Sequence, residues 1–212
     1  MRQLNILIVG ANGQLGRYLI KYIVESNDHS AVALVNNGVQ KAYFTDMGVE
    51  TLTFDLNQKL TKILKLLRNI DALVITGSLD EKNKETLTEI DEMLKLVDAA
   101  IYAGVSRIIY VSTFETQALP LYFRSTFVKK YYIEKWLKLS GSHFTIIKSG
   151  TLVDKKGTGL VEIGSNIKNK ETSKEDIAQF ILACLENDAT IRKTIKVASG
   201  KTPIQQILST LK

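Results

Sequence analysis

Three glycines at three-residue spacing, Gly10, Gly13 and Gly16, give the clearest chemical signal in this sequence. They follow an apolar run at 6–9, and apolar residues recur at helical spacing over 15–23, so the pattern predicts a buried strand that turns sharply into a helix. The first amides of a helix have no partner within it and attract anions. The turn is therefore predicted to bind the pyrophosphate of a dinucleotide.

Each glycine of this turn has an expected function. Gly10 allows the tight turn, Gly13 lets the backbone approach the pyrophosphate, and Gly16 lets the helix pack closely on the strand. The spacing is GxxGxxG rather than GxGxxG, and its position between a strand and a helix supports nucleotide binding over a merely structural loop. The residues expected to hold the pyrophosphate are Gly10, Asn12, Gly13, Gln14, Leu15 and Gly16.

The expected contacts to the adenosine leave the choice of cofactor open. Asn36 stands about twenty positions after the last glycine, where a carboxylate typically accepts the ribose hydroxyls and an arginine binds a 2′-phosphate. An asparagine supplies no charge, so NAD and NADP both remain candidates, with NADP slightly favoured. Lys41, a few residues further on, is a candidate to bind a 2′-phosphate, although the sequence is equally consistent with an ordinary surface lysine in a short helix. Asp55 and Leu56 are expected at the adenine edge.

Small and polar residues follow three further buried strands, where ligands of parallel sheets bind. Gly77 and Ser78 follow the strand at 72–75 and are expected to flank the ribose. The strand at 107–111 delivers a hydroxyl pair that is predicted either to polarise an acceptor or to cap a turn. The strand at 144–148 is likewise followed by small residues. The cofactor candidates on these last two strands are Ser112, Thr113, Lys148, Ser149 and Gly150.

Strands and helices alternate along the whole chain. Further apolar runs at 31–35 and 50–54 complete a set of six strands, and a loop with Gly157 and Gly159 precedes two helices that start near 173 and 203. Ser173 and Asp176 are expected to cap the first of these helices. Right-handed connections then predict an α/β, doubly wound, mainly parallel sheet: one Rossmann-like, three-layer α/β/α domain over 1–212, with a short substrate-side segment at about 150–212.

Composition narrows the class of protein. The net charge of +6 is dispersed, and no basic arm or zinc spacing accompanies it, so neither nucleic acid nor a metal is an expected partner. No apolar stretch is long enough to span a bilayer, which predicts a cytoplasmic protein without a membrane partner, as a monomer or homodimer that binds a small-molecule substrate. The single cysteine, Cys184, lies on an apolar helix face and is predicted to pack in the core.

Several motifs in order resemble the atypical short-chain dehydrogenase/reductase family, in particular its NAD(P)-binding, NmrA-like branch. The turn at 10–16 is similar to its GATGxxG, and 48–56 to its "GV…DL" segment. The block from Glu134 to 150 is similar to "E..L..SG…TI.RPG", and 174–178 to "R.DVA". The resemblance implies a Rossmann-like fold and a nicotinamide cofactor, but Asn36 replaces an arginine that often contacts NADP in the family.

The resemblance implies a catalytic tyrosine and lysine, and two alignments of the family motif place them on different residues of this chain. Relatives use a Tyr-x-x-x-Lys pair, and Tyr131 and Lys135 have that spacing. Counting back from Glu134 instead places the family lysine on Lys130 and its tyrosine on Thr126. The catalytic candidates are Ser112, Lys130 and Tyr131, of which Lys130 is also expected to bind the cofactor near its ribose. They predict an NAD(P)H-dependent oxidoreductase that transfers hydride to a quinone, flavin or carbonyl acceptor, with an NAD(P)-sensing regulatory protein or a sugar-nucleotide-type epimerase/dehydratase as alternatives.

Overall fold

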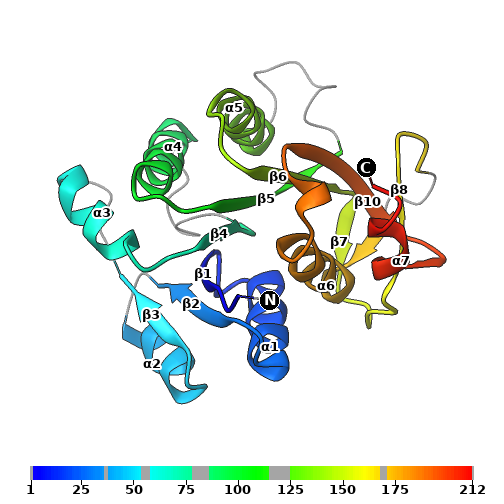
Figure 1. The fold of residues 1–212 in the computed structure, drawn as a ribbon, viewed down its shortest axis with the longest axis horizontal. Coiled ribbons are helices and arrows are strands. Elements are labelled where there is room, and N and C mark those ends of the chain that lie inside the picture. The colour runs from blue at the N-terminus through cyan, green and yellow to red at the C-terminus, as the bar shows by residue number, and fades with distance from the viewer. Residues whose placement is uncertain are drawn as a thin grey trace.

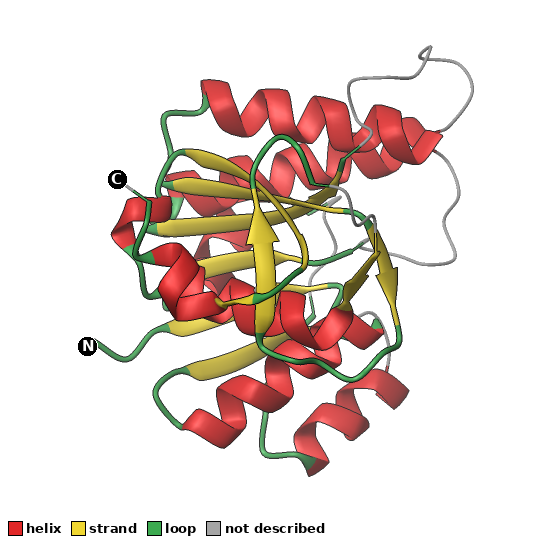
Figure 2. Cartoon of the chain, turned by 90° about the vertical axis from the view of Figure 1, so that its right-hand side faces the viewer, coloured by secondary structure: helices red, strands yellow, loops and turns green. Residues whose placement is uncertain are grey.

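The computed structural model describes residues 2–35, 38–53, 58–77, 86–114, 125–167 and 171–211, without the side chains of 86–89 and 125–127. Within these ranges the chain forms a nine-stranded sheet, a separate two-stranded sheet, and helices that cover both faces of the large sheet (Figure 1 and Figure 2). In the part of the chain that the structure describes, no helix combines the length and apolar character needed to cross a bilayer.

The large sheet has the order β11-β8-β10-β6-β5-β4-β1-β2-β3. Pairing is parallel from β3 to β10, and β8 is antiparallel to both of its neighbours. This arrangement confirms the predicted doubly wound, mainly parallel sheet, whose strand order reverses between β1 and β4. Its strands are β1 (Asn5–Val9), β2 (Ser30–Leu34), β3 (Glu50–Leu52), β4 (Ala72–Ile75), β5 (Arg107–Thr113), β6 (Phe144–Ser149), β8 (Leu160–Ile163), β10 (Lys193–Ser199) and β11 (Thr202–Pro203).

The helices alternate with the strands, as the sequence predicts. They are α1 (Gln14–Ser26), α2 (Gly38–Asp46), α3 (Leu60–Leu67), α4 (Thr86–Tyr102), α5 (Ser125–Leu139), α6 (Lys174–Leu185) and α7 (Ile204–Leu208), with a 3₁₀ turn at Asp188–Thr190. Helices α1 and α6 pack against each other on one face of the sheet, and α3, α4 and α5 lie on the other (Figure 1). These are the three layers of an α/β/α sandwich.

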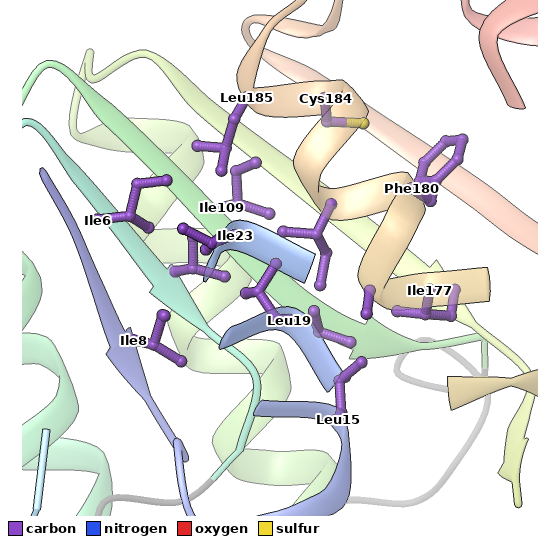
Figure 3. Close-up of a cluster of buried hydrophobic side chains, with 14 of the residues drawn as sticks. Ile6, Ile8, Leu15, Leu19, Ile23, Ile109, Ile177, Phe180, Cys184 and Leu185 are labelled. Carbon is purple, nitrogen blue, oxygen red and sulfur yellow. The ribbon is translucent and has the colours of Figure 1, made fainter. Parts of the chain in front are cut away.

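Both faces of the central strands are buried, which explains their uninterrupted apolar sequences. Ile6 and Ile8 of β1 pack against α1, whereas Leu7 of the same strand packs on the opposite face. Figure 3 shows the first cluster, in which side chains of α1 and α6 meet above β1 and β5. Cys184 lies in this cluster with no solvent exposure, and burial raises the pKa of its thiol to about 12. The prediction that Cys184 packs in the core is confirmed.

The segment after β6 contains more strand than its sequence pattern indicates. The sequence predicts no strand beyond 148, yet β8, β10 and β11 extend the large sheet, and β7 (Thr151–Val153) pairs in parallel with β9 (Glu171–Ser173). Strand β10 lacks the uninterrupted apolar run of the central strands, because Lys196 stands between its buried residues Ile195 and Val197. The second, small sheet lies beside the carboxyl ends of the main strands.

The start of α6 differs from the predicted capping pattern. Ser173 is the N-cap residue, but its side chain donates to the carbonyl of Lys155 at 2.7 Å instead of capping the helix. Asp176 is buried and accepts hydrogen bonds from the amides of Thr158 and Gly159, both at 2.7 Å. The loop at 157–159 turns its three amides toward the start of the helix, where Asp176 satisfies two of them and Glu175 accepts from the amide of Gly157 at 2.8 Å. The "R.DVA" aspartate therefore holds this loop in place.

Candidate functional site

The glycine turn adopts the geometry that its spacing predicts. Gly10 has a φ of +78°, in the left-handed region that favours glycine. A Cβ at this position would lie 2.8 Å from the amide nitrogen of Gly77 and 2.9 Å from Oγ1 of Thr76. A glycine is thus needed at position 10 for two reasons: the positive φ, and the close packing of the turn after β4 on the turn after β1.

The other two glycines shape the start of α1. A Cβ on Gly16 would collide with the carbonyl of Gly10 and lie 2.7 Å from Cα of Ala11, so only glycine allows this close approach of helix and turn. Gly13 is the N-cap residue, with no side-chain cap, and the first turn of α1 holds no acidic residue. The first amides of α1 are therefore open to an external anion, which is how helix N-termini bind phosphates.

Arg17 is a functional candidate that the sequence analysis missed. Its guanidinium donates to Asn12 Oδ1 at 2.6 Å and to the Asn12 carbonyl at 2.9 Å, and it lies 4.5 Å above the centre of the Tyr43 ring. These residues, with Val39 and Gln40, line a cavity of about 420 Å³ beside the turn. Lys41 is not among the described residues that line this cavity. The signal in the sequence was an arginine directly after the last glycine.

A larger cavity of about 500 Å³ opens at the carboxyl ends of β4, β5 and β6. It brings together six of the predicted site residues: Gly77, Ser112, Thr113, Lys130, Ser149 and Gly150. The other residues that line it are Thr76, Met93, Tyr110, Val111, Lys129, Ile133, Thr151 and Leu152. Among described residues, Thr113 Oγ1 is buried without a hydrogen-bond partner, so this cavity contains a polar atom that a ligand could satisfy.

A buried charge cluster adjoins this cavity. Glu134, on α5, accepts a hydrogen bond from Ser112 Oγ at 2.5 Å and forms an ion pair with Lys148 Nζ at 2.8 Å. All three residues are at most 4% exposed, so the pair is shielded from water. The hydroxyl of Ser112 uses its hydrogen for this bond to Glu134, and the ammonium of Lys148 balances the charge of the carboxylate. The sequence identified Glu134 only as part of a motif and missed that it joins β5, α5 and β6.

Lys130 lies one helical turn before Glu134 and lines the cavity. Burial lowers the pKa of its ammonium to about 8, although the nearby Glu134 carboxylate opposes this shift. Burial, and secondarily Glu134, raises the pKa of the Tyr110 phenol, so this hydroxyl stays protonated at neutral pH. Lys130 is thus a cavity-lining side chain that releases a proton near physiological pH.

Tyr131 is not brought into the cavity with Lys130. Its ring packs edge-on against Tyr132, with centroids 5.6 Å apart, and the Lys135 ammonium lies 5.5 Å from its centroid. Lys129, Lys130 and Ile133 of α5 line the cavity, whereas Tyr131 of the same helix does not. The literal Tyr-x-x-x-Lys spacing thus describes a contact between Tyr131 and Lys135, and the register counted from Glu134 is the one that puts a lysine in the cavity.

Four of the predicted cofactor contacts lie outside the described residues. These are Asn36, Asp55, Leu56 and Ser78. Their assignment to the adenosine and ribose stays a prediction.

The fold and this site together define a class of protein. A glycine turn that opens α1 next to the point where strand order reverses, beside a cavity at the carboxyl ends of the strands, is the arrangement of Rossmann-type dinucleotide-binding proteins. A family model described as NAD(P)H-binding matches residues 10–188, and the chain belongs to this family. The predicted resemblance to atypical short-chain dehydrogenases/reductases of the NmrA-like branch is confirmed.

Known relatives match all or much of this chain. The uncharacterized sugar epimerase YhfK of Bacillus subtilis is 30% identical over 98% of this chain and 100% of its own. Quinone oxidoreductase 2 of Escherichia coli is 26% identical, over 68% of this chain and 48% of its own. A solved structure of a candidate NAD-dependent epimerase/dehydratase from Bacillus halodurans has a TM-score of 0.85 and 27% identity, covering 98% of this chain and 100% of that one. The chain therefore shares its fold with the B. halodurans protein.

Proposed function

We propose that this protein is an NAD(P)H-dependent oxidoreductase that transfers hydride to a small conjugated acceptor, of the quinone, flavin or carbonyl type. One observation carries the proposal: Gly77, which lines the 500 Å³ cavity, is in direct contact with Gly10 of the diphosphate turn. A dinucleotide bound at the turn therefore has its reactive end within reach of the cavity. The E. coli quinone oxidoreductase among the relatives supports this class of acceptor.

The residues present fit a nicotinamide cofactor. The cradle at Gly10 and Gly16 would be filled by any Cβ, the amides of α1 are uncapped, and Thr113 offers an unsatisfied hydroxyl in the cavity. When bound, the nicotinamide supplies the hydride. The chain itself would hold the diphosphate at the turn, exclude water with the apolar wall formed by Met93, Ile133 and Leu152, and supply a proton.

Lys130 is the proton donor in this proposal. It lines the cavity, and burial places the pKa of its ammonium near 8, which matches a general acid that works around neutral pH. Ser112 is less suited to polarise an acceptor directly, since its hydroxyl already donates a hydrogen bond to Glu134. Instead, Ser112 and Lys148 would fix Glu134, whose charge keeps Lys130 protonated. Thr113 would hydrogen-bond to the acceptor or the nicotinamide.

The position of Arg17 supports a preference for NADP. Its guanidinium, Tyr43 and Gln40 surround the small cavity beside the turn, which offers a cation and an aromatic face of the kind that bind a 2′-phosphate and adenine. We expect Arg17→Met to weaken NADPH binding by roughly tenfold, or about 1.4 kcal/mol, with little effect on NADH. Calorimetric titration with both cofactors measures this difference, and equal losses for the two would contradict the assignment.

The proposed reaction is tested by following NADPH and NADH absorbance with a panel of quinones, flavins, aldehydes and ketones. Turnover with a quinone or flavin supports the proposal. Tight cofactor binding without turnover favours an NAD(P)-sensing regulatory protein, for which the absence of Tyr131 from the cavity is the supporting observation. Conversion of a sugar nucleotide without net cofactor oxidation favours an epimerase, in line with the name of the B. subtilis relative. A cytoplasmic location remains a prediction.

A further inference from the structure

Lys174 joins the glycine turn at 10–16, where the diphosphate is proposed to bind, to the segment that follows β6. Its Nζ donates to the side-chain oxygen of Gln14 and to Asp154 Oδ1, the latter at 2.8 Å. Gln14 is the first residue of α1, and Asp154 directly follows β7. A residue 160 positions along the chain thus places a cation at the start of the cofactor-binding helix.

The surroundings of this ammonium favour an anionic ligand. The Lys174 side chain is only 20% exposed, so the contacts hold it at the turn instead of leaving it in solvent. The first turn of α1 adds the partial positive charge of a helix N-terminus and contains no carboxylate. The acidic group paired with Lys174, Asp154, is 55% exposed and lies on the side of the small sheet. Positive charge is therefore concentrated where the diphosphate is expected.

We propose that Lys174 is a cofactor-binding residue that contacts the diphosphate, and that its ion pair with Asp154 breaks or weakens when the cofactor binds. The inference rests on the proposed cofactor binding at the glycine turn. The ligand class that Lys174 recognises is a diphosphate ester, because a compact ammonium binds phosphate oxygens as a point charge and needs no fixed orientation. Gln14 then positions the lysine in the empty protein, through its side-chain oxygen.

This contact also connects the two parts of the site. Lys174 directly follows β9, β9 pairs with β7, and Ser173 Oγ donates to the Lys155 carbonyl at 2.7 Å. Thr151 and Leu152 of β7 line the 500 Å³ cavity. A diphosphate held by Lys174 therefore fixes the small sheet that forms one wall of the acceptor cavity. Cofactor binding and the position of that wall are linked through a single side chain.

The test measures binding of NADPH and of ADP-ribose, which keeps the diphosphate but lacks the nicotinamide, by calorimetry at several salt concentrations. We expect Lys174→Met to weaken both ligands by about tenfold and to reduce the dependence of affinity on salt, since one charge-assisted contact is lost. Lys174→Arg should stay within about twofold of the wild type, because it keeps the charge. Asp154→Asn should bind both ligands severalfold more tightly, since it removes the competing carboxylate.

Lys155→Met is the matched control. It breaks the Lys155–Glu171 ion pair, 2.7 Å long, in the same segment without touching the turn, and it should leave both affinities unchanged. If Lys174→Met binds both ligands like the wild type, or weakens NADPH alone, Lys174 is only a structural link and the inference is wrong. A wild-type protein that binds neither ligand contradicts the proposed function itself, and this inference with it.

Discussion

The two sides of the ligand site are built by different means. On the cofactor side, the turn between β1 and α1 uses backbone: three glycines, uncapped amides and a helix N-terminus, all within a few residues of the sequence. On the acceptor side, Ser112, Lys130, Glu134 and Lys148 come from β5, α5 and β6 and act through buried charge. The proposed recognition of the diphosphate therefore depends mainly on local shape, to which the distant Lys174 adds a charge, whereas the proposed proton chemistry depends on tertiary packing.

The strongest way to break the cofactor side is Gly13→Asp. Gly13 has a φ of −67°, and a Cβ there would lie 3.3 Å from the Gly10 carbonyl, so a side chain is accommodated with a small adjustment. An aspartate at an N-cap also stabilises the helix. Repulsion of a phosphate charge about 4 Å away costs about 4 kcal/mol at an intermediate dielectric, or roughly a thousandfold in affinity for either cofactor.

Calorimetry and urea unfolding of the same Gly13→Asp sample separate binding from folding. Gly13→Ala, which adds a Cβ without a charge or a capping group, is the control and should lose much less affinity than Gly13→Asp. Retention of NADPH binding by the folded Gly13→Asp variant would show that the diphosphate does not lie at this turn.

On the acceptor side, the largest expected effect of a substitution is on the stability of the fold. Glu134→Gln removes the partner of the buried Lys148 and leaves its charge uncompensated, which should lower the free energy of unfolding by about 3 kcal/mol. The double variant Glu134→Gln with Lys148→Met removes both charges and should recover much of that loss. Urea unfolding of the four proteins in this cycle measures the coupling, and independent, additive losses would contradict a paired cluster.

Lys130 gives the acceptor side a pH signature that the cofactor side lacks. A general acid must be protonated, so kcat/KM should be level below pH 8 and fall about tenfold per pH unit above the lowered pKa of this lysine, which is about 8. Lys130→Met should reduce kcat/KM by roughly a hundredfold and abolish its fall at high pH, which is the alkaline limb of the pH profile, while cofactor affinity changes little. Because Glu134 raises the pKa of Lys130, Glu134→Gln should move the limb to lower pH. A limb that persists in Lys130→Met would assign the proton to another group.

The smallest effect is expected for Tyr131→Phe. Its ring packs against Tyr132 and Lys135 away from the cavity-lining residues, and both contacts survive loss of the hydroxyl. Turnover should therefore stay within about twofold of the wild type, measured with the best acceptor of the panel. A loss of a hundredfold or more would restore Tyr131 as the catalytic acid and remove Lys130 from that role.

Prediction from sequence worked where the signal is local. The glycine spacing anticipated the φ of Gly10 and the close approach at Gly16, and the apolar runs anticipated the six central parallel strands. It failed where neighbours in space are distant in the chain. Strand β10 pairs with β6 across about fifty residues, and Asp176 was expected to cap its own helix but binds the loop at 157–159.

The sequence by itself determined the parallel α/β fold and the glycine turn at 10–16, because apolar periodicity and glycine conformations act over a few residues. Only the tertiary structure decided that Glu134 joins Ser112 and Lys148, that Lys130 rather than Tyr131 lines the cavity, and that Lys174 reaches Gln14. The physical reason is that a buried charge acquires its partner, and with it its pKa and role, only when separate elements pack together.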